Sequence, residues 1–437
     1  MSTAATDRAA PPRLTRRASS ETEMTSRGVG VLAAGIVIAV LGVGLSTPIL
    51  VYIGVAMTCA VAVAWIWLVL AVDAFLRVIP ATRREVSPHP LTAGVPGTVS
   101  VTIDSRVGGR HPRMRRSVTE HLDLREQAAA ELTGGAGTKA TVTRRDGILT
   151  LRYSLHPTRR GRWPLGPALV HSGDPFGMLH ADTPVGEPQL VPVWPAVVDL
   201  SGTAGALMGH ADRVVLGART PSPDDASLRD YREGDDLRRV HWASSARLGT
   251  MLVRSDERAG RRPATVILDA PREPLALEWA ISAAASIALS VLDSGHPVRM
   301  IGAGLDAEAV RHLGERGGEA ARYELLNQTV DLHAPVSRAD STNQLVRSAA
   351  LAADDARQGE VTVGVLEPLS QEALDALVPI GDSGRAWAIV RTGPATEADA
   401  RRTVRGLRRA GWRATTISPT DDLAELWTRM LTAGEIE

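Results

Sequence analysis

Residues 28–72 read GVGVLAAGIVIAVLGVGLSTPILVYIGVAMTCAVAVAWIWLVLAV, which is 45 consecutive residues without a charged side chain. A helix needs about 20 apolar residues to cross the ~30 Å hydrocarbon core of a bilayer, so this run is about twice as long as one span requires. Pro48 lacks the N–H that a continuing helix would donate, and it interrupts the run. The stretch therefore predicts a membrane hairpin, within residues 28–76, whose two helices are Gly28–Leu45 and Ile49–Val72.

Arginines flank the apolar run on both sides. They are Arg8, Arg13, Arg16, Arg17 and Arg27 before it, and Arg77, Arg83 and Arg84 after it. Because an excess of arginine marks the cytoplasmic side of membrane segments, we expect a protein of the inner (cytoplasmic) membrane with both termini in the cytoplasm. Residues 1–27 are polar and are expected to be a disordered tail. A cleaved signal peptide is the alternative, but its apolar region would be shorter and would not be followed by a second span.

The composition excludes several classes of function. The chain has 49 basic and 49 acidic residues, so its formal net charge is zero, which argues against a general nucleic-acid binder. Cys59 is the single cysteine, so no intrachain disulfide can form. No Walker motif is present, which argues against ATP hydrolysis by that route, and no cofactor is predicted.

Short alternating runs between glycines and prolines dominate residues 85–200. The clearest are Thr98–Ile103, Thr141–Thr143, Ile148–Tyr153 and Ala168–Val170. Closely spaced short strands with turn signals between them are typical of an antiparallel, immunoglobulin-like β-sandwich.

A turn is predicted inside this region at Asp174-Pro175-Phe176-Gly177-Met178. Asp before Pro starts a turn, and Gly allows a positive φ. We expect Phe176 to anchor the turn through apolar packing, so the residues are interpreted as a structural corner.

Residues 263–437 alternate apolar strands with helices. Strands are expected at Ala264–Asp269, an apolar run that ends in Asp, and at Pro297–Ile301, Val361–Leu366, Ala386–Val390 and Trp412–Ile417. Helices are expected at Leu275–Leu292, Gln371–Val378 and Glu397–Ala410. This order predicts a doubly wound, mainly parallel α/β sheet. Whether residues 303–360 are a folded insert or a mobile arm stays open.

The most informative segment, within the linking region 201–262, runs from Tyr231 to Arg247. It reads YREGDDLRRVHWASSAR, and a helix is expected to begin near Asp235 or Asp236 and to end at Gly249. Its candidate residues for partner binding or interdomain contact are Tyr231, Arg232, Gly234, Asp235, Arg238, His241, Trp242, Ser245 and Arg247.

Catalysis by this segment is the less favoured reading. His241 and Ser245 are four residues apart and could meet on one helical face. A nucleophilic serine, however, usually needs a strained elbow and an oxyanion hole, and no Gly-x-Ser-x-Gly turn occurs here. A metal site of Asp235, Asp236 and His241 is also disfavoured, because these residues share no obvious face.

The Tyr231–Arg247 string, the Asp174–Met178 turn and the preceding hairpin together resemble the DUF58 family of unknown function. The resemblance covers roughly residues 28–300 and implies a C-terminal half similar to von Willebrand factor A domains. It also implies a partner, because genes of this family commonly lie beside those of MoxR-type AAA+ ATPases and often of transglutaminase-like membrane proteins. The family has no established enzymatic activity.

The resemblance directs attention to Asp269, which follows the first strand of the α/β half. In von Willebrand A-like domains a metal site reads Asp-x-Ser-x-Ser at this place, whereas this chain has Asp269, Pro271 and Glu273. Both hydroxyl ligands are missing, and one aspartate with Glu273 is a poor cage for a hard divalent ion. We expect the fold without its metal and Asp269 as a degenerate remnant.

These patterns lead to one functional hypothesis and two alternatives. The hypothesis is a non-enzymatic, membrane-anchored adaptor or scaffold that presents its α/β domain to a MoxR-type ATPase during the assembly or maturation of a complex, and that contacts lipid through residues 28–76. One alternative is a membrane-tethered hydrolase that uses Ser245 and His241, or a metal-dependent activity at Asp269. The other is a structural scaffold of the cell envelope.

Overall fold

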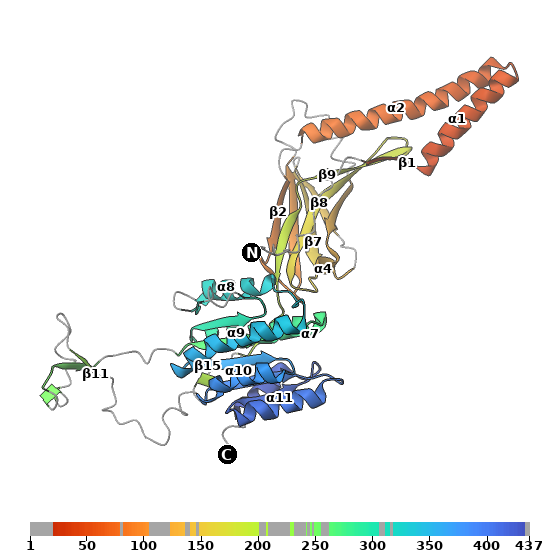
Figure 1. Cartoon of the computed structure of the whole chain (residues 1–437). Coiled ribbons are helices and arrows are strands. Elements are labelled where there is room, and N and C mark those ends of the chain that lie inside the picture. Colours follow the sequence, from red (N-terminus) through yellow and green to blue (C-terminus); the bar gives the residue numbers. More distant parts are fainter. Residues whose placement is uncertain are drawn as a thin grey trace, which may run out of the picture. The chain divides into compact units, whose positions relative to one another are not determined.

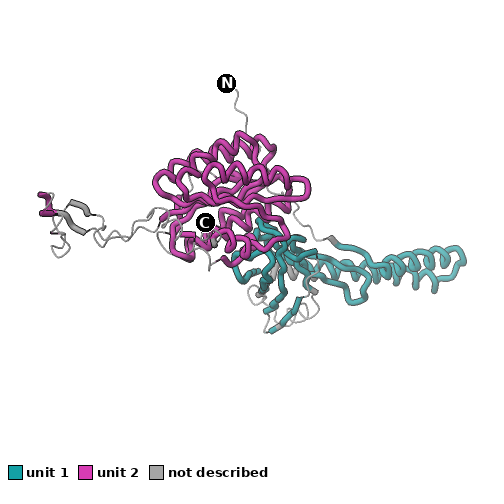
Figure 2. Tube along the Cα trace, turned by 90° about the horizontal axis from the view of Figure 1, so that it is seen from below, with its two compact units in different colours: residues 1–193 teal, residues 194–437 magenta. Residues whose placement is uncertain are grey.

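The structure is a computed structural model in which the chain divides into two compact units, residues 1–193 and residues 194–437 (Figures 1 and 2). Each unit is described by itself. The described residues are 21–78, 82–104, 123–135, 140–145, 148–200, 207–208, 228–230, 242, 245–246, 249–254, 262–305, 311–314 and 318–432.

Two long apolar helices begin the first unit. Helix α1 spans Ser26–Gly44 and α2 spans Pro48–Val78, so the predicted break at Pro48 is present and α2 runs beyond the apolar stretch. A Cβ added at Gly54 would lie 2.4 Å from the backbone nitrogen of Ala39, which shows how closely the helices approach. Both are long and apolar enough to cross a membrane. The same holds for α7 (Pro274–Asp293), but 78% of its apolar window is buried within the second unit.

Two antiparallel sheets form the rest of the first unit. In one, β1 (Glu21–Met24), β9 (Leu179–Val185), β8 (Gly161–Gly173), β10 (Gln189–Trp194) and β3 (Leu91–Thr92) follow in this order, with β5 (Asp123–Ala128) beside β8 and followed by the short helix α4 (Ala130–Thr133). The other has the order β2 (Thr82–Ser87), β4 (Gly97–Asp104), β7 (Ile148–Leu155) and β6 (Ala140–Arg145).

The alternate apolar side chains predicted from the sequence point into one core that the two sheets share. On β4 and β7 the buried cross-strand pairs are Val99 with Tyr153, Val101 with Leu151 and Ile103 with Leu149. They pack with Leu165, Val170, Val185, Val191 and Val193 of the first sheet. The two sheets therefore form layers on one hydrophobic core.

The expectation of a disordered tail is wrong for residues 21–27. Strand β1 pairs with β9, so that Glu21 lies opposite Asp182 and Met24 opposite Leu179, and Thr25 is the N-cap of α1. Backbone pairing with a partner more than 150 residues away holds this polar segment in place, and no local pattern reveals such a partner.

A five-stranded parallel sheet organises the second unit. Its order is β14 (Val298–Gly302), β13 (Ala264–Leu268), β15 (Val361–Leu366), β16 (Ala386–Arg391) and β17 (Arg413–Ile417). Every neighbouring pair is parallel. A mixed α/β architecture is thus confirmed.

Helices cover both faces of this sheet. On one face lie α7 and α12 (Leu423–Thr432), with α8 (Gly318–Val330) in the same core. On the other lie α9 (Arg338–Arg357), α10 (Gln371–Gly381) and α11 (Glu397–Arg409). In the described part of residues 303–360, α8 and α9 are folded parts of the unit and no mobile arm is seen.

The boundary between the units lies earlier than predicted. Residues from Trp194 onward belong to the second unit, where the backbone N–H of Val198 donates to Oγ of Ser286 at 2.9 Å. Leu200, Leu207 and Met208 are buried in the core of that unit. A small antiparallel pair, β11 (Leu228–Asp230) and β12 (Leu252–Arg254), follows.

Candidate functional site

The strand order places a candidate site at the C-terminal edge of the parallel sheet. In chain order the strands lie 2-1-3-4-5, so the chain leaves β13 toward β14 on one side and returns to β15 on the other. In open α/β sheets ligands bind at such a switch point, beyond the carboxyl ends of the strands. Asp269 follows β13, Glu367 follows β15, and Arg391 ends β16.

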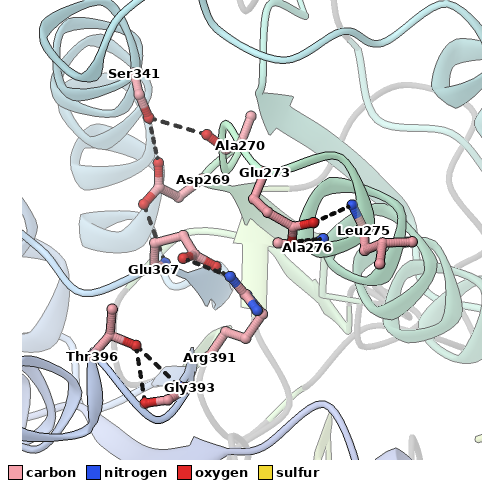
Figure 3. A network of polar contacts seen from close by, with 10 residues as sticks. All are labelled: Asp269, Ala270, Glu273, Leu275, Ala276, Ser341, Glu367, Arg391, Gly393 and Thr396. Atoms are coloured by element: carbon pink, nitrogen blue, oxygen red, sulfur yellow. Dashed lines mark hydrogen bonds and ion pairs between the residues drawn. The ribbon is translucent and has the colours of Figure 1, made fainter.

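Asp269 is buried and held from two sides (Figure 3). Its Oδ1 accepts a hydrogen bond from Oγ of Ser341 at 2.8 Å, and its Oδ2 accepts one from the backbone N–H of Glu367 at 3.2 Å. Ser341 lies in the first turn of α9 and also donates to the carbonyl oxygen of Ala270 at 3.3 Å. Asp269 thus ties the ends of two strands to one helix.

Burial raises the pKa of Asp269 above its ordinary value. The hydrogen bonds from Ser341 and from the backbone of Glu367, and the positive charge of Arg338, oppose this effect without cancelling it. Ionisation of this buried carboxyl would therefore make the folded state less stable. Carboxyl groups with perturbed pKa values are common at functional sites.

Glu367 and Arg391 form the second polar pair of the site (Figure 3). Nε of Arg391 lies 2.6 Å from Oε1 of Glu367, and Nη2 lies 3.2 Å from Oε2, so the pair is bidentate. Burial raises the pKa of Glu367, while Arg391 lowers it and the neighbouring Asp269 and Glu273 raise it further.

Glu273 has a structural partner. Its carboxylate caps α7 by accepting hydrogen bonds from the backbone N–H groups of Leu275 at 3.0 Å and Ala276 at 2.6 Å (Figure 3). Pro271 offers no hydroxyl. Among the described residues no group of three or more His, Cys, Asp or Glu side chains is arranged to hold a metal ion.

A pocket of about 330 Å³ opens above these groups. Besides Asp269, Glu367 and Arg391, its wall includes Arg272, Arg338, Thr342, Ser370, Thr396 and Asp399. Near the rim, Oγ1 of Thr396 accepts from the N–H of Gly393 at 3.0 Å (Figure 3). Asp269 is engaged by Ser341 and Glu367 by Arg391, and the exposed Arg272 and Arg338 line the same pocket, so the arrangement is suited to recognising a polar group.

Sequence reasoning found Asp269 but missed Ser341, Glu367 and Arg391. Glu367 and Arg391 lie at the ends of correctly predicted strands, and the rule that sites gather at those ends could have found them. Ser341 lies in the region whose order was left open, and only the fold brings it to Asp269.

Most of the Tyr231–Arg247 motif lies outside the described residues, including Tyr231, Arg232, Gly234, Asp235, Arg238, His241 and Arg247. Of the candidates there, only Trp242 and Ser245 are described. Trp242 is 64% exposed and is not packed as a buried contact. The backbone carbonyl of Ser245 accepts from the N–H of Gly249 at 2.9 Å.

The second motif forms the turn between β8 and β9. Asp174 is buried, and its carboxylate accepts hydrogen bonds from the backbone N–H groups of Phe176 at 2.9 Å and Leu179 at 2.6 Å. Gly177 has a φ of 68°, a conformation that favours glycine. Phe176 is 64% exposed, so the expectation that it anchors the turn by packing is wrong. The carboxylate of Asp174 holds the turn instead.

Comparison with known proteins identifies one family. The chain matches none of the curated proteins with which it was compared. Residues 227–378 match the family described as Protein of unknown function DUF58. This match spans the Tyr231–Arg247 motif, β13, Asp269, Ser341 and Glu367. The resemblance to DUF58 expected from the sequence is therefore confirmed over residues 227–378, where the chain carries a DUF58 domain.

Proposed function

We propose that this protein is a non-enzymatic, membrane-anchored adaptor whose α/β unit docks a MoxR-type AAA+ ATPase at the Asp269 pocket. The observation that carries the proposal is that both carboxyl groups of the pocket have partners within the fold: the buried Asp269 is held by Ser341, and the partly buried Glu367 is held by Arg391. Carboxyl groups that already have partners within the fold are less available as general bases or metal ligands, and they shape a stable polar surface for a partner.

The rim of the pocket offers exposed side chains of the kind that protein partners contact. Arg272 and Arg338 are exposed, and both line the pocket. Arginine is enriched among the residues that dominate binding energy at interfaces. Two exposed arginines at the pocket therefore support a docking rim.

The finer fold assignments belong to the same proposal. A parallel sheet with helices on both faces and a polar pocket at its switch point supports a von Willebrand factor A-like unit. Two antiparallel layers support an immunoglobulin-like sandwich. The helix pair, with Arg27 before α1, supports insertion in the cytoplasmic membrane with both termini in the cytoplasm, where an ATPase and a transglutaminase-like membrane protein would meet the chain.

An enzymatic function remains the alternative. A hydrolase would use Ser245 with His241, and a metal-dependent activity would use Asp269. The engagement of Asp269 by Ser341 and by the N–H of Glu367 favours the adaptor over the second of these. One experiment separates the adaptor from the Ser245/His241 hydrolase. A His241→Ala variant that still folds and inserts into the membrane should lose the biological function of the protein only if His241 is catalytic.

Co-purification tests the adaptor directly. The full chain, tagged at its C-terminus, is purified in mild detergent from its native membranes, once with ATP and once without. We expect a MoxR-type ATPase to be recovered, with a yield that depends on nucleotide. Recovery of no such ATPase under either condition would contradict the proposal.

A further inference from the structure

A second hollow lies in the first unit, between helix α1 and the turn at Asp174–Met178. It is an open groove of about 570 Å³. Its lining is apolar apart from one cation: Arg27, Gly30, Val31, Ala34, Met57, Phe176 and Met178. It is independent of the pocket at Asp269 and plays no part in the function proposed above.

The fold holds the two walls of this groove together. The hydroxyl of Thr25 donates to the carbonyl oxygens of Gly177 at 2.8 Å and Met178 at 3.0 Å. A Cβ added at Gly28 would lie 2.2 Å from the carbonyl oxygen of Met178, so the first turn of α1 touches the loop. The groove is therefore a fixed feature of the unit.

The groove lies at the start of α1, where the headgroup and the upper acyl chain of a lipid would both reach it. Arg27 is the last charged residue before the uncharged run that begins at Gly28, so its guanidinium belongs to the headgroup region and the following turns of α1 to the acyl region. Among the described residues, none forms an ion pair with Arg27, whose side chain is exposed.

Exposed apolar surface continues from the groove. Phe176 is 64% exposed at its edge, although burial of an aromatic ring is strongly favourable in a soluble fold. A Cβ at Gly30 would meet nothing within 4 Å, so open space lies along α1 next to this ring. An acyl chain on Gly30, Ala34 and Met57 would cover both features.

We propose that this groove binds one anionic phospholipid of the surrounding leaflet, with the phosphate at Arg27 and an acyl chain between α1 and Phe176. A guanidinium forms strong, directed hydrogen bonds with phosphate oxygens. The positive charge favours a lipid with a net negative headgroup over a zwitterionic one. Such a lipid would bridge the membrane helix and the turn of the β-sheet.

Native mass spectrometry of the full chain tests this site. The delipidated protein in detergent is given equal amounts of phosphatidylglycerol and phosphatidylcholine with identical acyl chains. We expect one phosphatidylglycerol to be retained in preference. Arg27→Gln should lower that preference about fivefold, which is the effect of one basic residue near the membrane surface.

Substitutions at two glycines of α1 distinguish binding in the groove from nonspecific lipid contact along the helix. Gly30→Leu fills the groove and should reduce the retention of both lipids. Gly44→Leu introduces the same side chain at the other end of α1, where a Cβ also meets nothing within 4 Å, and should leave retention unchanged. Equal melting temperatures of the two variants show that both are folded.

Three results would overturn the proposal. They are retention of phosphatidylcholine as strongly as phosphatidylglycerol by the unmodified protein, equal lipid binding by the Gly30→Leu and Gly44→Leu variants, and displacement of the lipid only by a co-purifying protein that occupies the groove. The first two would reduce the groove to a nonspecific annular surface, and the third would assign it to a protein partner.

Discussion

The hydroxyl of Thr25 donates a hydrogen bond of 2.8 Å to the carbonyl oxygen of Gly177, although the two residues are 152 positions apart. Thr25 is the N-cap of α1 and also accepts from the N–H of Gly28 at 3.2 Å. The residue that starts the membrane helix is thus bonded to the turn of the second sequence motif. Through this contact the start of the apolar helix pair and the Asp174–Met178 turn hold each other in position.

Thr25→Val removes this hydroxyl at nearly constant volume. Loss of an N-cap side chain costs about 1 kcal/mol of stability, and the contact with the turn is lost as well. We expect faster amide hydrogen exchange at β1 and at the start of α1, measured by mass spectrometry in detergent. Thr25→Ser keeps the hydroxyl and should exchange as the unmodified protein does; exchange as fast as in Thr25→Val would refute the role of the hydroxyl.

Gly54→Leu tests the close approach of α1 and α2. A Cβ at Gly54 would lie 2.4 Å from the nitrogen of Ala39 and 2.5 Å from the carbonyl oxygen of Gly35, so the helices must separate. Overpacking of this kind typically costs about 1–3 kcal/mol. We expect a lower melting temperature in detergent than for Gly44→Leu, whose Cβ meets open space. Equal melting temperatures would show that the helices do not depend on this contact.

Arg84→Met tests the buried ion pair of the first unit. The side chains of Arg84 and Glu126 are 6% and 1% exposed, and their closest atoms are 2.5 Å apart. Burial raises the pKa of Glu126, while Arg84 lowers it, so removal of the arginine leaves an uncompensated carboxyl. We expect a loss of about 3–5 kcal/mol in the free energy of unfolding, measured with denaturant.

Two further variants make the test of Arg84 specific. Arg83→Met breaks the exposed pair with Glu85 and should cost less than about 1 kcal/mol. Combining Arg84→Met with Glu126→Leu removes both charges and should recover much of the loss. A double variant as unstable as the single one would mean that packing, and not charge, explains the effect.

Asp269→Asn gives the pH dependence of the candidate site. Because burial raises the pKa of Asp269, the folded state holds this proton more tightly than the unfolded chain. The resulting stability is present at low pH and is lost as the pH rises through the raised pKa. The melting temperature of Asp269→Asn, relative to the unmodified protein, should therefore increase as the pH rises above the ordinary aspartate pKa of about 4. A difference independent of pH would show that Asp269 does not titrate as the burial implies.

Strong periodic patterns made the elements of the fold predictable. The uncharged run with Pro48 gave the helix pair, and the alternation in Ile148–Tyr153 gave a strand whose Leu149, Leu151 and Tyr153 are buried. The apolar run Ala264–Leu268 gave the first strand of the parallel sheet. In each case burial of side chains along one element decides the local structure.

What could not be predicted depends on contacts between distant segments. Glu21–Met24 has no apolar alternation and becomes a strand only because β9 offers a free edge. Ser341 reaches Asp269 because α9 begins near the end of β13. The two residues are 72 positions apart, and no local sequence pattern predicts that they meet. Phe176 was expected to anchor its turn through apolar packing, but it is 64% exposed and lines the groove beside α1.

Binding of the purified ATPase to the full chain in lipid nanodiscs tests the central claim most directly. Arg338 and Arg357 are both exposed and lie at opposite ends of α9, but only Arg338 lines the pocket at Asp269. If that pocket docks a MoxR-type ATPase, Arg338→Ala should raise the Kd about tenfold, and Arg357→Ala should leave it within about twofold. No measurable binding, or equal Kd values for the two variants, would contradict the account.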